Sequence, residues 1–145
     1  MVYLDTSFLA PLFLPEETSG DVAAYVQRLP ARELAVSNWT MVEFSSLLAR
    51  KVRANELNPE EAAETDAKFE AAVGDSFVML FPGGDDFAVA RRYVQRLETG
   101  LRAPDALHLA IAANNDARTI LSLDKKFIAA GRVLGLPVSQ GIGPE

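Results

Sequence analysis

Carboxylates occupy three places in this 145-residue sequence where catalytic side chains often stand. Asp5 comes directly after the apolar run Val2 to Leu4, and Asp124 ends the β-rich run Thr119 to Leu123. Asp105 lies in the first turn of a predicted helix. In an open α/β sheet the functional crevice lies beyond the carboxyl ends of the strands. The pattern therefore predicts that these three carboxylates share one crevice.

A fourth carboxylate, Glu43, stands on an apolar stripe. It follows Trp39 by four residues and precedes Leu47 by four, so a helix would place all three on one face. An unpaired buried charge is strongly unfavourable, so a buried Glu43 needs a partner. The alternative is an edge position from which Glu43 reaches water.

The three aspartates also have a purely structural interpretation. An Asp at a helix N-terminus caps free amide groups and complements the helix dipole, typically by about 0.5 to 2 kcal/mol. Asp5, Asp105 and Asp124 each precede or open a predicted helix. Any one of them alone fits a cap as well as a ligand.

Carboxylates gathered in one crevice require compensation. Two of them about 4 Å apart repel by roughly 4 kcal/mol at an effective dielectric of 20. Protonation or a divalent cation offsets this repulsion. With no cysteine and one histidine in the chain, an all-oxygen site favours Mg²⁺ or Mn²⁺. Phosphodiester hydrolysis is the chemistry that such a site would perform.

Alternating strands and helices must position these residues. Strands are predicted at 2–4, 34–36, 77–81, 119–123 and around 138, with helices at 18–29, 40–53, 86–98, 104–113 and 125–134 and one after Asn58. This order predicts an α/β fold, a three-layer α/β/α sandwich with a mostly parallel sheet. We expect a single domain over residues 1–145.

Composition excludes several classes of protein. The absence of cysteine rules out thiol catalysis, Cys-ligated zinc and disulfides. No glycine-rich dinucleotide motif or phosphate-binding loop occurs in the sequence. The longest apolar runs fall far short of the ~20 residues that cross a bilayer. We expect a cytoplasmic protein without a membrane segment.

The net charge of −6 argues at first sight against a nucleic-acid partner. Residues 56–75, however, contain seven acidic residues and one lysine, a pattern typical of a solvated helix face. Outside this segment the chain has 13 acidic and 13 basic residues. The acidic excess is therefore local and leaves an RNA substrate possible.

Four segments together resemble the PIN-domain ribonucleases, and most closely the VapC-like toxins of type II toxin–antitoxin systems. They are Leu4-Asp5-Thr6-Ser7, the lone Glu43, residues 101–110 (LRAPDALHLA) and residues 122–127 (SLDKKF). The likeness covers nearly the whole chain in order. Pro104 stands where such proteins often have Gly, and Ser122 where Thr is common.

The resemblance implies an Mg²⁺- or Mn²⁺-dependent endoribonuclease specific for single strands. Asp5, Glu43, Asp105 and Asp124 would be its catalytic and metal-binding residues, with Asp5 and Asp105 as the principal ligands and Asp124 acting through water or shaping the pocket. Thr6 and Ser122 would support the site by hydrogen bonds. A metal-activated water would attack the phosphorus and leave a 5′-phosphate and a 3′-hydroxyl.

Partners follow from the same resemblance. It implies an RNA substrate, a cognate VapB-like antitoxin and a homodimer. Arg102, Lys125 and Lys126 are the favoured RNA contacts, because they neighbour the proposed site in sequence. His108 lies one turn after Asp105, where it either braces that residue or packs in the core.

Other functions remain open from the sequence. One is a PIN nuclease that is not a toxin, and another is a catalytically degenerate PIN-like binding module. A phosphatase-like domain would want an acid at position 7, where Ser7 stands. A receiver-like domain would want an adjacent acidic pair near the first strand, which is absent.

Overall fold

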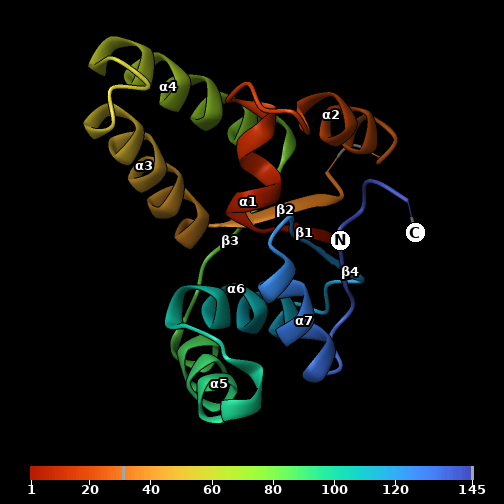
Figure 1. Cartoon of the computed structure of the whole chain (residues 1–145). Coiled ribbons are helices and arrows are strands. Elements are labelled where there is room, and N and C mark those ends of the chain that lie inside the picture. The colour runs from red at the N-terminus through yellow and green to blue at the C-terminus, as the bar shows by residue number, and fades with distance from the viewer. Residues whose placement is uncertain (31, 145) are drawn as a thin grey trace.

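A five-stranded sheet, parallel throughout, runs through the centre of the computed structural model, which describes residues 1–30 and 32–144 (Figure 1). The strand order is β3-β2-β1-β4-β5. The strands are β1 (Val2–Leu4), β2 (Leu34–Ser37), β3 (Val78–Leu80), β4 (Thr119–Leu121) and β5 (Val138–Ser139). The predicted α/β sandwich with a parallel sheet is confirmed.

Helices cover both faces of this sheet. They are α1 (Thr6–Leu9), α2 (Ser19–Gln27), α3 (Asn38–Arg53), α4 (Pro59–Ser76), α5 (Gly84–Gln95), α6 (Ala103–Asn114) and α7 (Lys125–Val133), with 3₁₀ turns η1 (Ala10–Leu12) and η2 (Leu97–Thr99). In residues 1–30 and 32–144, none of the helices combines the length and the apolarity needed to span a membrane.

Several predicted helix and strand ends shift by one to three residues in the structure, and the ends of α5 shift most. The helix predicted to begin at Asp86 starts at Gly84, because the Asp86 carboxylate accepts a hydrogen bond from the Gly83 amide and organises the first turn. It ends at Gln95 rather than Glu98, and η2 follows. The turn ends at Gly100, whose φ of 65° is left-handed and suits glycine.

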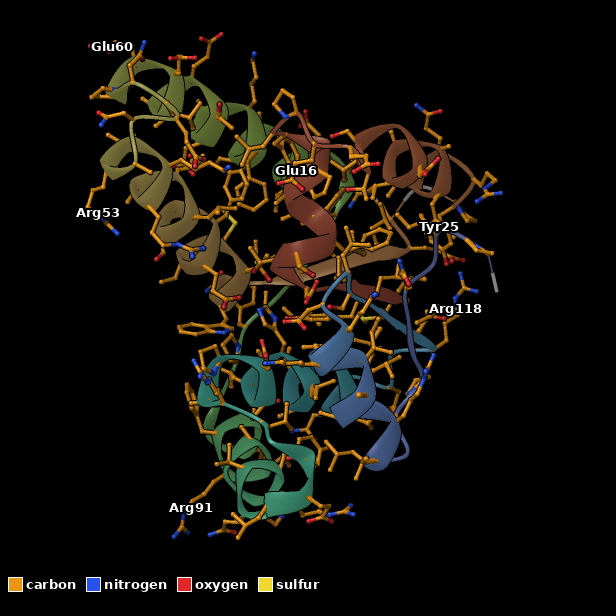
Figure 2. All side chains as sticks on the ribbon, in the orientation of Figure 1. Glu16, Tyr25, Arg53, Glu60, Arg91 and Arg118 are labelled. Carbon is orange, nitrogen blue, oxygen red and sulfur yellow. The ribbon has the colours of Figure 1, made fainter. Side chains whose placement is uncertain are left out.

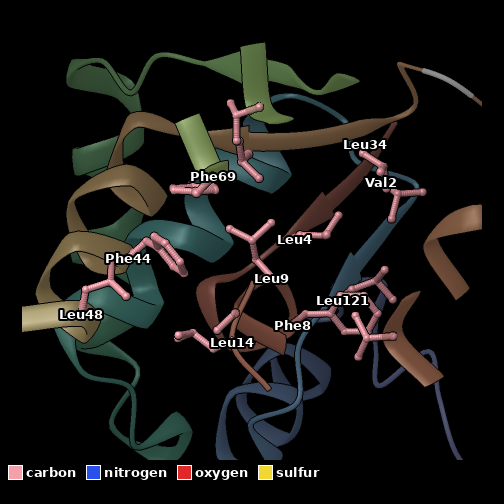
Figure 3. Packing of buried hydrophobic residues seen from close by; sticks show 14 residues of the cluster. Val2, Leu4, Phe8, Leu9, Leu14, Leu34, Phe44, Leu48, Phe69 and Leu121 are labelled. Carbon is pink, nitrogen blue, oxygen red and sulfur yellow. The ribbon is translucent and has the colours of Figure 1, made fainter. Parts of the chain in front are cut away.

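Side chains alternate between two hydrophobic cores. Val2 and Leu4 of β1 face the core beneath α1 to α4, where Phe44 and Phe69 stack with ring centroids 4.3 Å apart (Figure 3). Tyr3, between them in sequence, faces the opposite core under α5 to α7. Burial on both faces is what a parallel sheet covered by helices requires.

Helices α3 and α4 form a hairpin that extends beyond the sheet (Figure 1). Each begins with a capping box, Ser37 with Thr40 in α3 and Asn58 with Glu61 in α4. Phe69 of α4 is buried against the first core, whereas most of the acidic side chains of α4 are exposed.

The central strands end together at one edge of the sheet. Leu4 of β1 pairs with Leu121 of β4, and Tyr3 pairs with Ala35 of β2. Strands β2 and β3 lie on one side of β1, whereas β4 and β5 lie on the other side. The strand order therefore reverses at β1, which makes this edge a topological switch point. Asp5 follows β1 there.

Candidate active site

A pocket of about 510 Å³ opens at this edge of the sheet. All four predicted acidic residues line it, although they come from four separate segments of the chain. Glu16, which the sequence analysis did not select, is a fifth carboxylate in the lining. The crevice predicted from the strand ends is therefore present, and these side chains face it: Asp5, Glu43, Asp105 and Asp124.

Asp5 is fixed by three hydrogen bonds. Its Oδ1 accepts from the Ser7 hydroxyl at 2.8 Å and from the Phe8 amide at 3.0 Å, and its Oδ2 accepts from the Ser122 hydroxyl at 2.7 Å. Only 4% of the residue is exposed. Burial raises the pKa of Asp5 above its ordinary value, while the charge of His108 and these donors act in the opposite direction. Asp5 thus caps α1 and lines the pocket at once.

Glu43 has partners on two other elements. Its Oε1 accepts hydrogen bonds from the Thr6 hydroxyl of α1 at 2.7 Å and from Nε2 of His108 on α6. Burial alone would raise the pKa of Glu43, but the hydrogen bond and charge of His108, with Thr6 and Arg50, lower it. The structure supplies the partner that a part-buried glutamate requires.

Asp105 and Asp124 differ in their surroundings. Asp105 is part-buried on the first turn of α6 and makes no capping bond. Burial, then the charges of Asp124 and Asp5, raise the pKa of Asp105 to about 6. Asp124 is exposed, and its Oδ1 accepts from the amides of Lys126 at 2.8 Å and Phe127 at 3.3 Å. The capping interpretation therefore holds for Asp124 but not for Asp105.

Ser7 contacts three other residues of the site by hydrogen bonds. The sequence did not predict this role. Besides its bond to Asp5, the Ser7 oxygen lies 3.1 Å from that of Ser122 and accepts the Leu123 amide at 2.9 Å. The Ser122 oxygen in turn accepts the Asp124 amide at 3.0 Å. The only sequence signal for Ser7 was its place in the Asp-Thr-Ser run.

The pocket lining includes a basic residue other than the three predicted as RNA contacts. Arg102, Lys125 and Lys126 are all exposed, and none lines the pocket. Arg50, one of the two arginines on α3, does line it, seven residues after Glu43 on the same helical stripe. This spacing was the available signal for Arg50.

The sequence left two roles open for His108, bracing Asp105 or packing in the core, and the structure places it in the core. It is 1% exposed, and its two nitrogens bond to Glu43 and to the Tyr3 hydroxyl rather than to Asp105. Although His108 lies one turn after Asp105 on α6, the two side chains are therefore not hydrogen-bonding partners.

The pocket suits a hard divalent cation that keeps part of its water shell. Among the described residues, no group of three or more His, Asp or Glu side chains is drawn together as a metal cluster. Mg²⁺ commonly takes only one or two carboxylates, with waters and substrate phosphate completing its shell. The oxygen donors fit such an ion, and so does the raised pKa of Asp105, which burial and then the charges of Asp124 and Asp5 produce.

The fold and pocket together define a class, the α/β proteins with an acidic pocket at the switch point of a parallel sheet. Residues 2–133 match the model of the PIN domain family. The chain therefore belongs to the PIN-domain family. Among curated protein sequences, none matches it.

Several solved structures share its fold. VapC20 of Mycobacterium tuberculosis, described as a sarcin–ricin loop cleaving toxin, has a TM-score of 0.72 at 22% identity, covering 90% of this chain and 95% of that one. FitAcB from Neisseria gonorrhoeae has a TM-score of 0.74 at 19% identity, with coverage of 97% and 98%. VapBC-1 from nontypeable Haemophilus influenzae has a TM-score of 0.69 at 18% identity, also covering 97% and 98%. At these identities the likeness establishes the fold.

Proposed function

We propose that residues 1–145 act as one Mg²⁺- or Mn²⁺-dependent endoribonuclease domain, specific for single-stranded RNA, and that it is the toxin of a VapBC-type pair. The observation that carries the proposal is the convergence of Asp5, Glu43, Asp105 and Asp124 on one pocket of a PIN-domain fold. Such a pocket in a family whose structural neighbours include VapC toxins supports RNA cleavage.

The carboxylates of such a site would have different roles in cleavage. A bound divalent cation would neutralise charge on the phosphoryl oxygens and lower the pKa of water. Asp5, held by three donors, presents its carboxylate in one orientation. Burial and neighbouring charges raise the pKa of Asp105 to about 6, so near neutral pH its carboxylate would be ionised and would help to hold the cation. Hydrolysis adds water across the phosphorus–O3′ bond and leaves a 5′-phosphate and a 3′-hydroxyl.

RNA also needs cationic contacts beyond the reacting phosphate. Arg50 stands inside the pocket and is suited to a phosphate next to the cleaved one. Arg102, Lys125 and Lys126 precede or follow pocket residues along the chain and would hold the strand at the rim.

The toxin proposal includes two protein partners, a VapB-like antitoxin and a second copy of this chain. A structure from Klebsiella pneumoniae that shares the fold, with a TM-score of 0.69 at 19% identity, is described as a toxin–antitoxin complex, which supports an antitoxin partner for this chain. Val42 of α3 and Phe87 of α5 are exposed by 58% and 57%, and both line an apolar groove that a homodimer would cover. Light scattering on the wild type and on Phe87→Glu tests the dimer, which the variant should dissociate.

The cleavage proposal is tested with a 5′-labelled single-stranded RNA in Mg²⁺ or Mn²⁺, with EDTA as the control. We expect metal-dependent fragments that carry 3′-hydroxyl ends. RNA binding without cleavage would favour the degenerate binding module. Cleavage that no adjacently encoded protein inhibits would favour a PIN nuclease that is not a toxin. Mapping the cuts in total RNA then identifies the substrate.

A further inference from the structure

A chain of polar side chains runs through the buried core to the pocket. The Tyr3 hydroxyl on β1 lies 3.0 Å from Ser37 Oγ at the end of β2 and 2.7 Å from His108 Nδ1 on α6. His108 Nε2 then meets Glu43 Oε1. Tyr3, Ser37 and His108 are at most 1% exposed, so each polar atom depends on its neighbour in the chain.

The direction of donation along this chain follows from its ends. The ionised Glu43 carboxylate only accepts hydrogen bonds, so Nε2 of His108 carries the donated proton. When the ring carries no second proton, Nδ1 accepts from the Tyr3 hydroxyl and the Tyr3 oxygen accepts from Ser37. Ser37 Oγ in turn accepts the Thr40 amide at the start of α3. In this arrangement each hydrogen bond from the Thr40 amide to Glu43 has one donor and one acceptor. The charged ring, which acts to lower the pKa of Asp5 and of Glu43, donates from both nitrogens instead.

The same bonds restrict what Glu43 offers to the pocket. Oε1 already accepts from Thr6 at 2.7 Å and from His108. No hydrogen bond among the described residues engages Oε2. Glu43 lies on α3 and His108 on α6, which cover opposite sides of the sheet, so the bond joins the two layers (Figure 1).

We propose that His108 is a positioning residue for Glu43, with the Ser37–Tyr3–His108 chain fixing the carboxylate so that only Oε2 faces the ligands of the pocket. The functional consequence rests on the ribonuclease proposed above, whereas the hydrogen-bond order does not. His108 touches neither substrate nor reacting atoms in this role. Second-layer partners that orient a ligand commonly alter metal affinity or activity by about 10- to 100-fold.

Three variants separate positioning from mere packing. His108→Leu removes the donor, and we expect kcat on single-stranded RNA to fall about 10- to 100-fold with KM for RNA changed far less. His108→Gln places an amide donor near the position of Nε2 and should restore most of kcat. Ile111→Val shortens a buried apolar side chain of the same helix that takes no part in these hydrogen bonds, so it should lower stability and leave kcat unchanged.

A spectroscopic test stands independently of activity. The sequence has one histidine, so ¹⁵N-histidine labelling gives unambiguous ring signals. At pH 8 we expect the proton on Nε2 and a bare Nδ1. Glu43→Ala should shift the Nε2 resonance and speed exchange of its proton, while Tyr3→Phe should shift Nδ1.

The outcomes distinguish the two proposals. A proton on Nδ1 with a bare Nε2, or ring signals indifferent to Glu43→Ala, would overturn the hydrogen-bond order. His108→Gln as inactive as His108→Leu while equally well folded would overturn the positioning role. A wild type that cleaves no RNA would defeat the ribonuclease proposal, and the NMR result would still decide the arrangement of His108 and Glu43.

Discussion

Acidic side chains gather in two regions of this molecule, the pocket at the carboxyl edge of the sheet and the surface of α4. On α4 they are spread over an exposed helix, with Glu60 in its first turn (Figure 2). Glu64 there pairs with Lys68 at 3.4 Å. In the pocket, Asp5 is 4% exposed and the pKa of Asp105 rises to about 6 through burial and neighbouring charges. The acidic residues of α4 are therefore mostly solvated, whereas Asp5 and Asp105 in the pocket are buried or part-buried and lie close to other carboxylates. Convergence and burial, rather than the number of acids, mark the candidate site.

The largest expected difference between the two regions is in catalysis. Asp5→Asn or Asp105→Asn should lower kcat/KM for RNA cleavage by about a thousandfold, because each removes a carboxylate that helps hold the cation. The matched control replaces Glu60, Glu64 and Glu70 of α4 with Gln and should leave kcat/KM within about twofold. Equal losses in both sets would show that overall charge, rather than the pocket, sets the activity.

A smaller effect is expected when a support of the pocket is removed. Ser122→Ala deletes the donor to Asp5 Oδ2 and the acceptor for the Asp124 amide. Because Ser122 is fully buried, the free energy of unfolding should fall by about 1 to 3 kcal/mol and cleavage by about tenfold. Urea denaturation and single-turnover cleavage measure the two effects. An unchanged protein in both would mean that Asp5 needs no such partner.

The pocket should also reduce the stability of the metal-free protein. Since the pKa of Asp105 is raised to about 6, the folded chain binds that proton more tightly than the unfolded chain, and stability falls as the pH rises from about 4 to above 6. Asp105→Asn removes this loss. After allowance for solvent screening of a part-buried carboxyl, we expect a gain of about 1 kcal/mol at pH 8, or roughly 2 to 4 °C in Tm.

The pH dependence provides the control for this prediction. The melting curves of the wild type and the variant should draw together below pH 6 and converge near pH 3, where the carboxyl is mostly protonated in both the folded and the unfolded wild type. Added Mn²⁺ should raise the Tm of the wild type at pH 8 more than that of the variant. A variant that melts below the wild type at pH 8 would contradict the proposed repulsion.

Removing one carboxylate from α4 should change the free energy of unfolding by an amount close to the limit of measurement. Glu64→Gln breaks the exposed pair with Lys68 and should change the free energy of unfolding by less than about 0.5 kcal/mol. Urea denaturation at low and at high salt measures it, and salt should remove most of any difference. A loss above 1 kcal/mol would show that α4 is not simply a solvated face.

Much of this contrast could be predicted from the sequence. Short apolar runs ended by Asp5 and Asp124 predicted strands whose carboxyl ends carry acids, and the parallel sheet brings such ends together. The cluster of acids after Asn58 predicted a solvated helix. Both inferences depend on local patterns, namely hydrophobic runs, caps and charge spacing.

Long-range pairing could not be predicted in the same way. The sequence indicated that Glu43 needs a partner, yet His108 is 65 residues away and meets it only because α3 and α6 pack across the sheet. Ser7 and Arg50 gain their places in the pocket from the angle of α1 and the direction of one stripe on α3. The end of β4 at Leu121 likewise follows from Ser122 turning toward Asp5.

The central claim is that the divalent cation binds among the buried carboxylates of the pocket and not on acidic α4. Paramagnetic broadening tests it directly: sub-stoichiometric Mn²⁺ is added to the ¹⁵N-labelled protein at pH 8 and amide signals are followed residue by residue. The account predicts that signals around Asp5 and Asp105 broaden first and that those of α4 persist, with Asp5→Asn abolishing the effect. Broadening centred on α4, or broadening unchanged by Asp5→Asn, would contradict it.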